Sequence, residues 1–298
     1  MKRSKFLAGV LLLLAVSFVP ARAQPAGTNA SALHCLWKVE GKTNAVYLLG
    51  SIHLLKPENY PLAAPIESAF KAAQVVAFET DMEKMEQPET QFKLLSKAGL
   101  PSGETLKQRL SGEVYTNFSQ HVDDAGLTMF MFEYLKPGIA AMTLELMQVQ
   151  KLGFEPQYGL DKHFFERARD DGKQIIAFET VDFQINLVTG LSKEEDELVM
   201  RCTLADIDNT KKLCGEMMTA WQTGDAAVLQ QLLNSFLVQA PVIYARLVTD
   251  RNRSWLPKIQ EILAGGKNGI VIVGAGHLVG SEGVVELLKK QGLKVTQL

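Results

Sequence analysis

Residues 45–53 read AVYLLGSIH, an apolar run that leads directly into the sequence Gly-Ser-Ile-His. The same order recurs near the C-terminus, where residues 269–277 read GIVIVGAGH. Short apolar runs bounded by glycine are typical of buried strands. Each segment is therefore predicted to be a strand whose carboxyl end carries a G-x-x-H motif, ending at His53 in the first and at His277 in the second.

Two more apolar runs end in glutamate and threonine. Residues 75–80 read VVAFET and residues 175–180 read IIAFET, so four of the six positions are identical and two exchange valine for isoleucine. Chance similarity among apolar strands is one explanation, but the shared polar ending favours a duplicated unit. We therefore expect two related half-domains that face one another, with Glu79 and Glu179 at equivalent strand ends.

Segments with helical periodicity separate the predicted strands. They cover residues 61–73, 82–152, 159–171 and 191–264, while residues 33–40 and 45–49 flank a turn as a β-hairpin and residues 294–297 form a last strand. Strands alternating with helices indicate an α/β protein. The predicted fold is two pseudo-symmetric α/β halves around a central sheet, with inserted helical segments, over residues 33–298.

The first 23 residues have the pattern of a secretory signal peptide. Basic residues at positions 2, 3 and 5 precede the apolar run 6–19, and residues 21–23 read ARA, which predicts cleavage after Ala23. The run is short for a bilayer span, so no stable membrane insertion is expected after cleavage. Residues 24–32 then form a linker, and the predicted location is periplasmic or extracellular.

Removal of this segment changes the charge of the chain. The whole sequence carries 31 basic and 33 acidic residues, a formal charge of −2. Without the four basic residues of the signal peptide the charge becomes about −6. A nucleic-acid partner is therefore not expected, because it requires a basic surface.

Three cysteines remain after processing, and an odd number cannot pair completely. Cys202 and Cys214 lie in one predicted helical stretch and could form a disulfide. Cys35 lies in an apolar strand, where a buried and unreactive thiol is expected.

The strand-end residues indicate where chemistry takes place. Open α/β sheets place their sites at the carboxyl ends of strands, where glycine lets the chain turn sharply. The imidazoles of His53 and His277 and the carboxylates of Glu79 and Glu179 would then converge. Such a set suits a divalent metal ion with one open position, or a histidine–glutamate pair acting as general acid and base.

Other familiar motifs are absent or incomplete. No H-E-x-x-H or G-x-S-x-G sequence is present, which leaves zincin and nucleophile-elbow mechanisms unsupported. The glycines at 274, 276 and 280 have the wrong spacing for a dinucleotide site, and no acidic residue follows the last strand. His163 could line the strand-end cleft, but Asp161 beside it is explained as a helix cap.

The order and spacing of several motifs resemble the TraB/GumN/Tiki family over roughly residues 33–298. The motifs are WKV (37–39), LLGSIH (48–53), FETD (78–81), GLDKHF (159–164), ETVDFQ (179–184), RNRSW (251–255) and VGAGHLVG (273–280). The resemblance implies a fold related to the erythromycin-esterase and haem-binding ChaN-like proteins. For the animal members it also implies a metal-dependent protease that uses two G-x-x-H motifs and a glutamate, which here are His53, His277 and Glu79.

The leading hypothesis is therefore a secreted metal-dependent hydrolase, with peptidase as the favoured activity. The two histidines and Glu79 would bind a divalent ion (Mn, Co or Zn), and Glu179 would be a further ligand or the base that activates water. Arg251 would steady the oxyanion or, alternatively, pair with one of the glutamates. Asn252 would orient a ligand.

Two rival hypotheses use the same cleft. One is a non-catalytic protein that binds haem or another ligand, in a pocket lined by methionines at 129, 131, 142 and 147. The other is a metal-free, esterase-like hydrolase in which a histidine acts as base. The substrate would be a peptide or a small molecule, and the sequence does not specify an oligomeric state.

Overall fold

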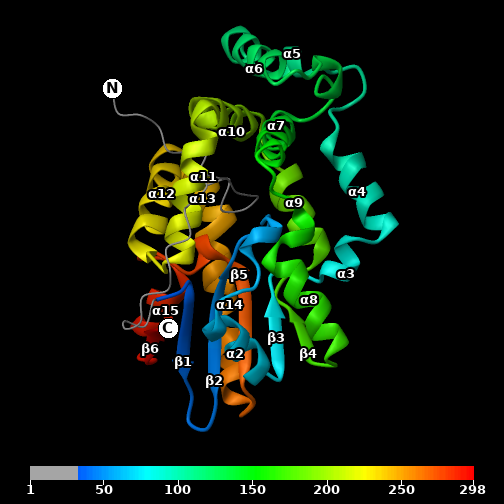
Figure 1. Ribbon diagram of the computed structural model, residues 1–298. Coiled ribbons are helices and arrows are strands. Elements are labelled where there is room, and N and C mark those ends of the chain that lie inside the picture. The colour runs from blue at the N-terminus through cyan, green and yellow to red at the C-terminus, as the bar shows by residue number, and fades with distance from the viewer. Residues whose placement is uncertain (1–32) are drawn as a thin grey trace.

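The computed structural model describes residues 33–298, except for the side chains of residues 233–239. The predicted signal peptide and linker lie outside the described residues. Within them the chain forms a six-stranded sheet with the order β4-β3-β5-β2-β1-β6 (Figure 1). The strands are β1 (Leu36–Glu40), β2 (Ala45–Ser51), β3 (Val75–Phe78), β4 (Gln174–Ala177), β5 (Gly269–Gly274) and β6 (Val295–Gln297).

Four neighbouring strands of this sheet run parallel. β4 pairs with β3, β3 with β5 and β5 with β2, all in the parallel sense. β1 is antiparallel to both β2 and β6. The predicted hairpin and the α/β class are thus confirmed. Every residue of the central strand β5 is buried, as expected for a parallel strand covered on both faces.

The duplicated segments lie side by side in this sheet. The amide of Phe178 donates to the carbonyl of Phe78 at 2.9 Å, and the amide of Glu179 donates to that of Glu79 at 2.8 Å. The prediction of two half-domains facing one another is therefore wrong for this repeat. Equivalent residues instead pair directly across neighbouring strands, which brings the two glutamates together.

Helices cover both faces of the sheet. On one face α2 and α8 pack together, with the rings of Phe70 and Phe164 4.7 Å apart. On the other face α14 contacts β2 and β5 and packs against α15 (Figure 1). These helices are α2 (Ala64–Ala72), α8 (Leu160–Asp170), α14 (Asp250–Ala264) and α15 (Val284–Lys290).

The other helices lie mainly beyond the carboxyl ends of the parallel strands (Figure 1). They are α3 (Met82–Met85), α4 (Pro88–Ala98), α5 (Leu106–Arg109), α6 (Gly112–Asp124), α7 (Pro137–Lys151), α9 (Val181–Thr189), α10 (Lys193–Asp206), α11 (Thr210–Gln222), α12 (Ala226–Gln239) and α13 (Pro241–Tyr244). A π-helix, η5 (Ala245–Thr249), joins α13 to α14. No helix among residues 33–298 is both long and apolar enough to cross a membrane.

All three cysteines are buried, and none of them forms a disulfide within residues 33–298. The disulfide between Cys202 and Cys214 that the sequence left open is not formed; Cys202 lies in α10 and Cys214 in α11, with a 3-10 turn between the two helices. Cys35 is the buried thiol that was expected, and burial raises its pKa to about 12, so that it stays protonated.

One buried carboxyl group stands out in the helical region. Glu145 of α7 is fully buried, and neither of its carboxyl oxygens has a hydrogen-bond partner among the described residues. Burial and then the nearby charge of Asp206 hold the pKa of Glu145 well above its ordinary value. The neutral form of this side chain is therefore the one that fits the fold.

Glu145→Gln is predicted to stabilise the protein at alkaline pH. The folded protein keeps a proton on Glu145 that the unfolded chain releases above the ordinary value of 4.5, so stability falls as the pH rises above that value. In thermal unfolding, the variant should lose less stability than the wild type between about pH 5 and about pH 8. At the upper end its free energy of unfolding should exceed that of the wild type by roughly 1–3 kcal/mol.

The matched control is Glu113→Gln, at a highly exposed glutamate of α6. It should keep the pH dependence of the wild type. An unchanged pH dependence in Glu145→Gln would show that the buried carboxyl group is not the cause.

Candidate functional site

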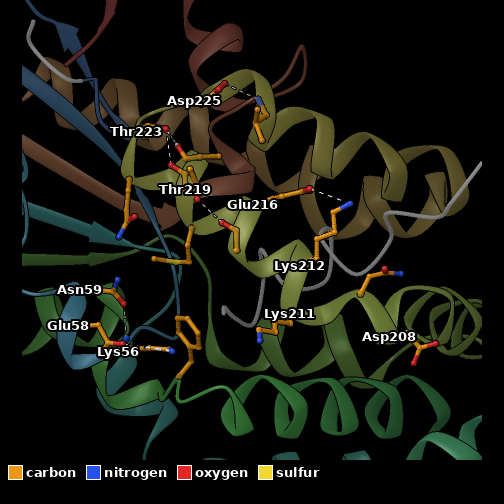
Figure 2. Close-up of a pocket in the computed structure, with 17 residues that line it drawn as sticks. Lys56, Glu58, Asn59, Asp208, Lys211, Lys212, Glu216, Thr219, Thr223 and Asp225 are labelled. Carbon is orange, nitrogen blue, oxygen red and sulfur yellow. Dashed lines mark hydrogen bonds and ion pairs between the residues drawn. The ribbon is translucent and has the colours of Figure 1, made fainter. Parts of the chain in front are cut away.

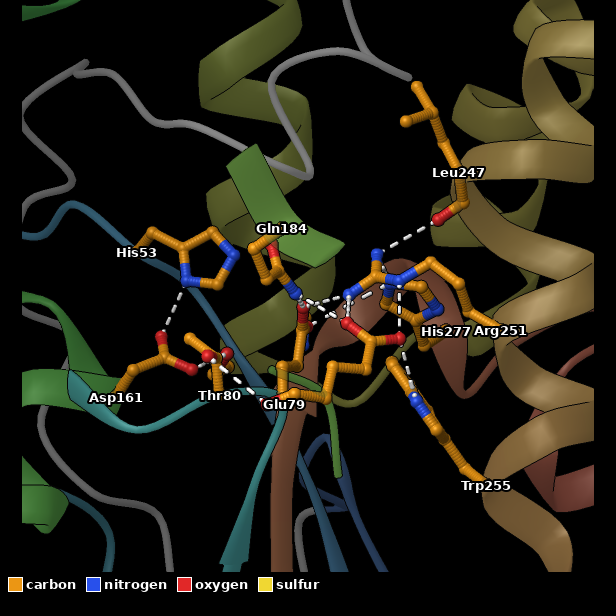
Figure 3. Close-up of polar contacts among 12 residues, drawn as sticks. His53, Glu79, Thr80, Asp161, Gln184, Leu247, Arg251, Trp255 and His277 are labelled. Carbon is orange, nitrogen blue, oxygen red and sulfur yellow. Dashed lines mark hydrogen bonds and ion pairs between the residues drawn. The ribbon is translucent and has the colours of Figure 1, made fainter. Parts of the chain in front are cut away.

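The four predicted strand-end residues lie at one edge of the sheet. His53 comes two residues after the end of β2, and His277 three residues after the end of β5. Glu79 follows β3 directly, and Glu179 comes two residues after β4. Because the four strands are parallel neighbours, their carboxyl ends bring these side chains into the same region. Figure 3 shows His53, Glu79 and His277 there.

Glycine in the first G-x-x-H motif serves close packing. A Cβ atom on Gly50 would lie 2.4 Å from the Sγ of Cys35 and 3.0 Å from the Cβ of Ala275. Gly50 lies within β2, so it does not make the sharp turn that was predicted. The missing side chain instead lets β2 lie against the segment that leads to His277.

Arg251 of α14 lies at the centre of the cluster (Figure 3). Its Nε and one terminal nitrogen donate to the two carboxylate oxygens of Glu179, both at 2.9 Å. The same terminal nitrogen donates to Glu79 at 2.5 Å. The other terminal nitrogen donates to the carbonyl of Leu247 at 2.9 Å and lies 3.0 Å from Nε2 of His277. All five N–H groups of the guanidinium thus have an acceptor.

The two glutamates receive further hydrogen bonds. The backbone amide of Gly274 donates to Glu79 at 2.8 Å, and Nε1 of Trp255 donates to Glu179 at 2.9 Å. The side-chain amide of Gln184 donates to Glu179 at 2.6 Å and to Glu79 at 3.4 Å. Burial would raise the pKa of Glu79, but the charge of Arg251 and the backbone amide of Gly274 hold it well below its ordinary value. Glu79 is therefore ionised.

His277 is neutral and fixed in orientation. Its Nε2 accepts from Arg251, while its Nδ1 lies 2.7 Å from Oδ1 of Asn252 and donates to it. Asn252 in turn donates to the carbonyl of Glu282 at 2.8 Å, which identifies Oδ1 as the atom that faces the imidazole. Burial and the charge of Arg251 lower the pKa of His277 to about 3.

His53 has the opposite protonation state. Its Nδ1 lies 2.6 Å from Asp161, whose other carboxylate oxygen accepts from the hydroxyl of Ser51 at 2.9 Å. Burial alone would lower the pKa of His53, but Asp161 raises it to about 9. The imidazole is therefore charged at neutral pH. About a quarter of the His53 side chain is exposed, whereas His277 is 1% exposed.

These contacts decide whether the predicted ligands fit a metal ion. Nε2 of His277 and one oxygen of Glu79 face Arg251, and His53 is protonated. Among the described residues, no group of three or more His, Cys, Asp or Glu side chains is placed to hold a metal ion. The set does not fit a divalent ion in this arrangement, because the guanidinium already fills the space between the donors.

Two cavities are relevant to access. One of about 350 Å³ is lined by Phe183, Asn186, Leu187, Arg246, Asp250, Arg251 and Ser254, so it borders the arginine of the cluster. Another of about 1050 Å³ lies between the Lys56–Asn59 segment and α11 (Figure 2). None of the strand-end residues is among the described residues that line this larger cavity.

Sequence reasoning missed three members of the site. Asp161 was explained as a helix cap, but its carboxylate binds Ser51 and His53. Gln184 and Trp255 were noted only within longer motifs. Gln184 follows Glu179 by five residues, and Glu179 lies before the start of α9, so no helical spacing rule predicts their contact. No signal in the sequence connects Trp255 with Glu179.

Asp161→Asn is predicted to lower the pKa of His53. The substitution removes the charge of Asp161 but leaves the burial of the imidazole unchanged, so the pKa should fall from about 9 to below the ordinary value of 6.5. An NMR titration of the histidine ring protons measures this directly. Asp208→Asn is the matched control, because Asp208 lies 3.8 Å from the unrelated His121. A His53 pKa that stays near 9 in Asp161→Asn would contradict the assignment.

Comparison with known proteins places the chain among relatives of one family. The model of the TraB/PrgY/gumN family matches residues 35–297. The Escherichia coli protein named "Uncharacterized protein YbaP" is 27% identical over 256 residues, which cover 82% of this chain and 87% of that protein. Metalloprotease TIKI1 of Xenopus tropicalis is 23% identical over 87% of this chain and 60% of its own length.

Metalloprotease TIKI2 of Danio rerio is 22% identical over 84% of this chain and 57% of its own length. This chain thus spans little more than half of the two metalloproteases. No solved structure gives a significant match, so the relation to erythromycin-esterase and ChaN-like folds stays a prediction. Because the family model covers nearly all the described residues, the chain belongs to the TraB/PrgY/gumN family.

Proposed function

We propose that this protein is a secreted hydrolase that cleaves peptide bonds at the strand-end cluster. Membership of the TraB/PrgY/gumN family and distant similarity to two proteins named metalloproteases support this assignment. The substrate class is taken from those names, because the cavities of the described structure do not select one ligand.

The observation that carries the proposal is the contrast between the two histidines. Nδ1 of His53 lies 2.6 Å from Asp161, which raises the pKa of His53 to about 9. Nε2 of His277 lies 3.0 Å from Arg251, and burial and this charge lower the pKa of His277 to about 3. Two like groups whose surroundings push their pKa values apart are typical of acid–base catalysis. His53 is the more exposed of the two and carries the proton, so it is the candidate acid that protonates the leaving amine. Asp161 holds its Nδ1, which leaves Nε2 for the substrate.

The candidate base is Glu179, and in this arrangement its carboxylate oxygens are already hydrogen-bonded. Both of its oxygens accept from Arg251, one also accepts from Trp255 and the other from Gln184. Glu179 can accept a proton from water only after some of these contacts break. The described arrangement is thus a resting state, in which Arg251 must move before the site can turn over. The displaced guanidinium is then the candidate group for the oxyanion.

A metal-free hydrolase is the second candidate. It is favoured by the guanidinium that fills the space between Glu79, Glu179 and His277. The haem-binding hypothesis gains no such support. Met129, Met142 and Met147 pack against the hydrophobic core, the common use of methionine, and Met131 is exposed.

His53→Ala is predicted to reduce kcat/KM for peptide hydrolysis by about 100-fold or more, because it removes the proton donor. The assay uses residues 24–298 and a library of quenched fluorescent peptides. Glu179→Gln should also abolish turnover, because it removes the candidate base. The matched control is His121→Ala, at a histidine of α6, which should keep wild-type activity. Thermal unfolding of each variant shows whether a loss reflects misfolding.

The results separate the alternatives. Retained turnover in His53→Ala would remove the proposed acid, and a wild type that cleaves no peptide would remove the peptidase assignment. Activity that persists after treatment with a chelator supports the metal-free hydrolase. Activity that is lost and restored by Mn²⁺ supports the metal-dependent one.

Secretion is tested separately. Expression of the full sequence in a bacterium with a periplasm should yield a protein whose first residue is Gln24, as measured by intact mass and N-terminal sequencing. Replacing Leu12 by Arg within the apolar run should retain the precursor in the cytoplasm. A wild-type protein that keeps Met1 would contradict cleavage after Ala23.

A further inference from the structure

We infer that Arg251 is a built-in competitor of divalent metal ions. Its guanidinium fills the space between Glu79, Glu179 and His277, and these three side chains can bind a divalent ion only when that guanidinium withdraws. The inference concerns cation binding and does not depend on the proposed hydrolysis.

The geometry of the three acceptors supports this competition. One terminal nitrogen of Arg251 lies 2.5 Å from Glu79 and 2.9 Å from Glu179, and the other lies 3.0 Å from Nε2 of His277. Carboxylate oxygens and a neutral imidazole nitrogen are the donors that divalent transition metals use, at about 2.0–2.2 Å. An ion bound to these atoms would overlap the guanidinium. The two cations therefore exclude one another.

The buried charges of the cluster also support competition between Arg251 and a divalent ion. Arg251, Glu79, Glu179 and His277 are all largely buried, and Arg251 places one positive charge against the two carboxylates. Asn252 holds His277 in the tautomer whose Nε2 lone pair faces the cluster, so the imidazole can act as a ligand without losing a proton first. Removing the guanidinium would leave two buried carboxylates without a cation, which is costly unless another cation replaces it.

The structure also provides space for the side chain to enter. The cavity of about 350 Å³ beside α9 is lined by Arg251 and by Asp250, an acid with about two thirds of its side chain exposed. The backbone acceptor of Arg251, the carbonyl of Leu247, lies in the π-helix η5 directly before α14. π-Helical turns occur frequently at functional sites.

The test is a calorimetric titration of metal-free protein, residues 24–298, with Mn²⁺. Arg251→Gln should bind one Mn²⁺ about tenfold or more tightly than the wild type. Arg251→Lys keeps a positive charge on the same stem and should bind as weakly as the wild type. Arg253→Gln is the matched control at an exposed arginine that pairs with Glu282 and Asp250, and it should not change the affinity.

A second substitution shows where the ion binds. Adding His277→Ala to Arg251→Gln should reverse the gain in affinity, since His277 supplies one of the three donors. The inference would be overturned if Arg251→Lys increased the affinity for Mn²⁺ as much as Arg251→Gln does. It would also be overturned if the higher affinity of Arg251→Gln persisted after His277→Ala was added. Stoichiometric tight binding by the wild type, unchanged in Arg251→Gln, would overturn it as well.

Arg251→Gln leaves buried carboxylates unpaired and can lower stability strongly. Thermal unfolding of Arg251→Gln is therefore measured with and without Mn²⁺. The variant should be stabilised by Mn²⁺ far more than the wild type, because the ion replaces the lost charge. A variant that Mn²⁺ neither binds nor stabilises would contradict the inference. Since both readouts report binding, they remain decisive even for a protein that hydrolyses no peptide.

Discussion

The guanidinium of Arg251 is the contact on which the site depends. It joins α14, from one face of the sheet, to Glu79 and Glu179 at the ends of two neighbouring strands. Three buried charges are stable together because every N–H of the guanidinium has an acceptor and both carboxylates receive additional donors. Truncating one partner of such a buried charged group typically lowers the free energy of unfolding by about 3–5 kcal/mol. This cluster therefore fixes the position of α14 and, through Asn252, the orientation of His277.

The sheet explains why these groups meet. Equivalent residues of the two repeated segments pair across β3 and β4, which places two like charges side by side at an edge where a cation is required. Close packing at Gly50 brings the two G-x-x-H segments together on the next two strands. His53 lies outside the arginine cluster and has its own partner, Asp161. The site thus consists of a buried part held by Arg251 and a more exposed part that contains His53.

Local patterns in the sequence were sufficient for the strands and for the edge where the site lies. Apolar runs ended by glycine or glutamate depend on neighbouring residues, so they can be read without a structure. Contacts between distant segments could not be read in this way. Asp161 is 108 residues from His53, and Arg251 is 172 residues from Glu79, so only the packing of α8 and α14 on the sheet brings them together. The same limit applies to Cys202 and Cys214, since a 3-10 turn separates two helices where one helical stretch was expected.

We infer that Arg251 and a divalent ion cannot occupy the cluster together. Crystals of the wild-type protein grown with Mn²⁺ test it most directly, through anomalous scattering from manganese. We expect either no anomalous peak between Glu79, Glu179 and His277, or a peak there with the guanidinium displaced from both carboxylates. A peak at bonding distance from Glu79 and His277, with Arg251 still bound to both glutamates, would contradict it.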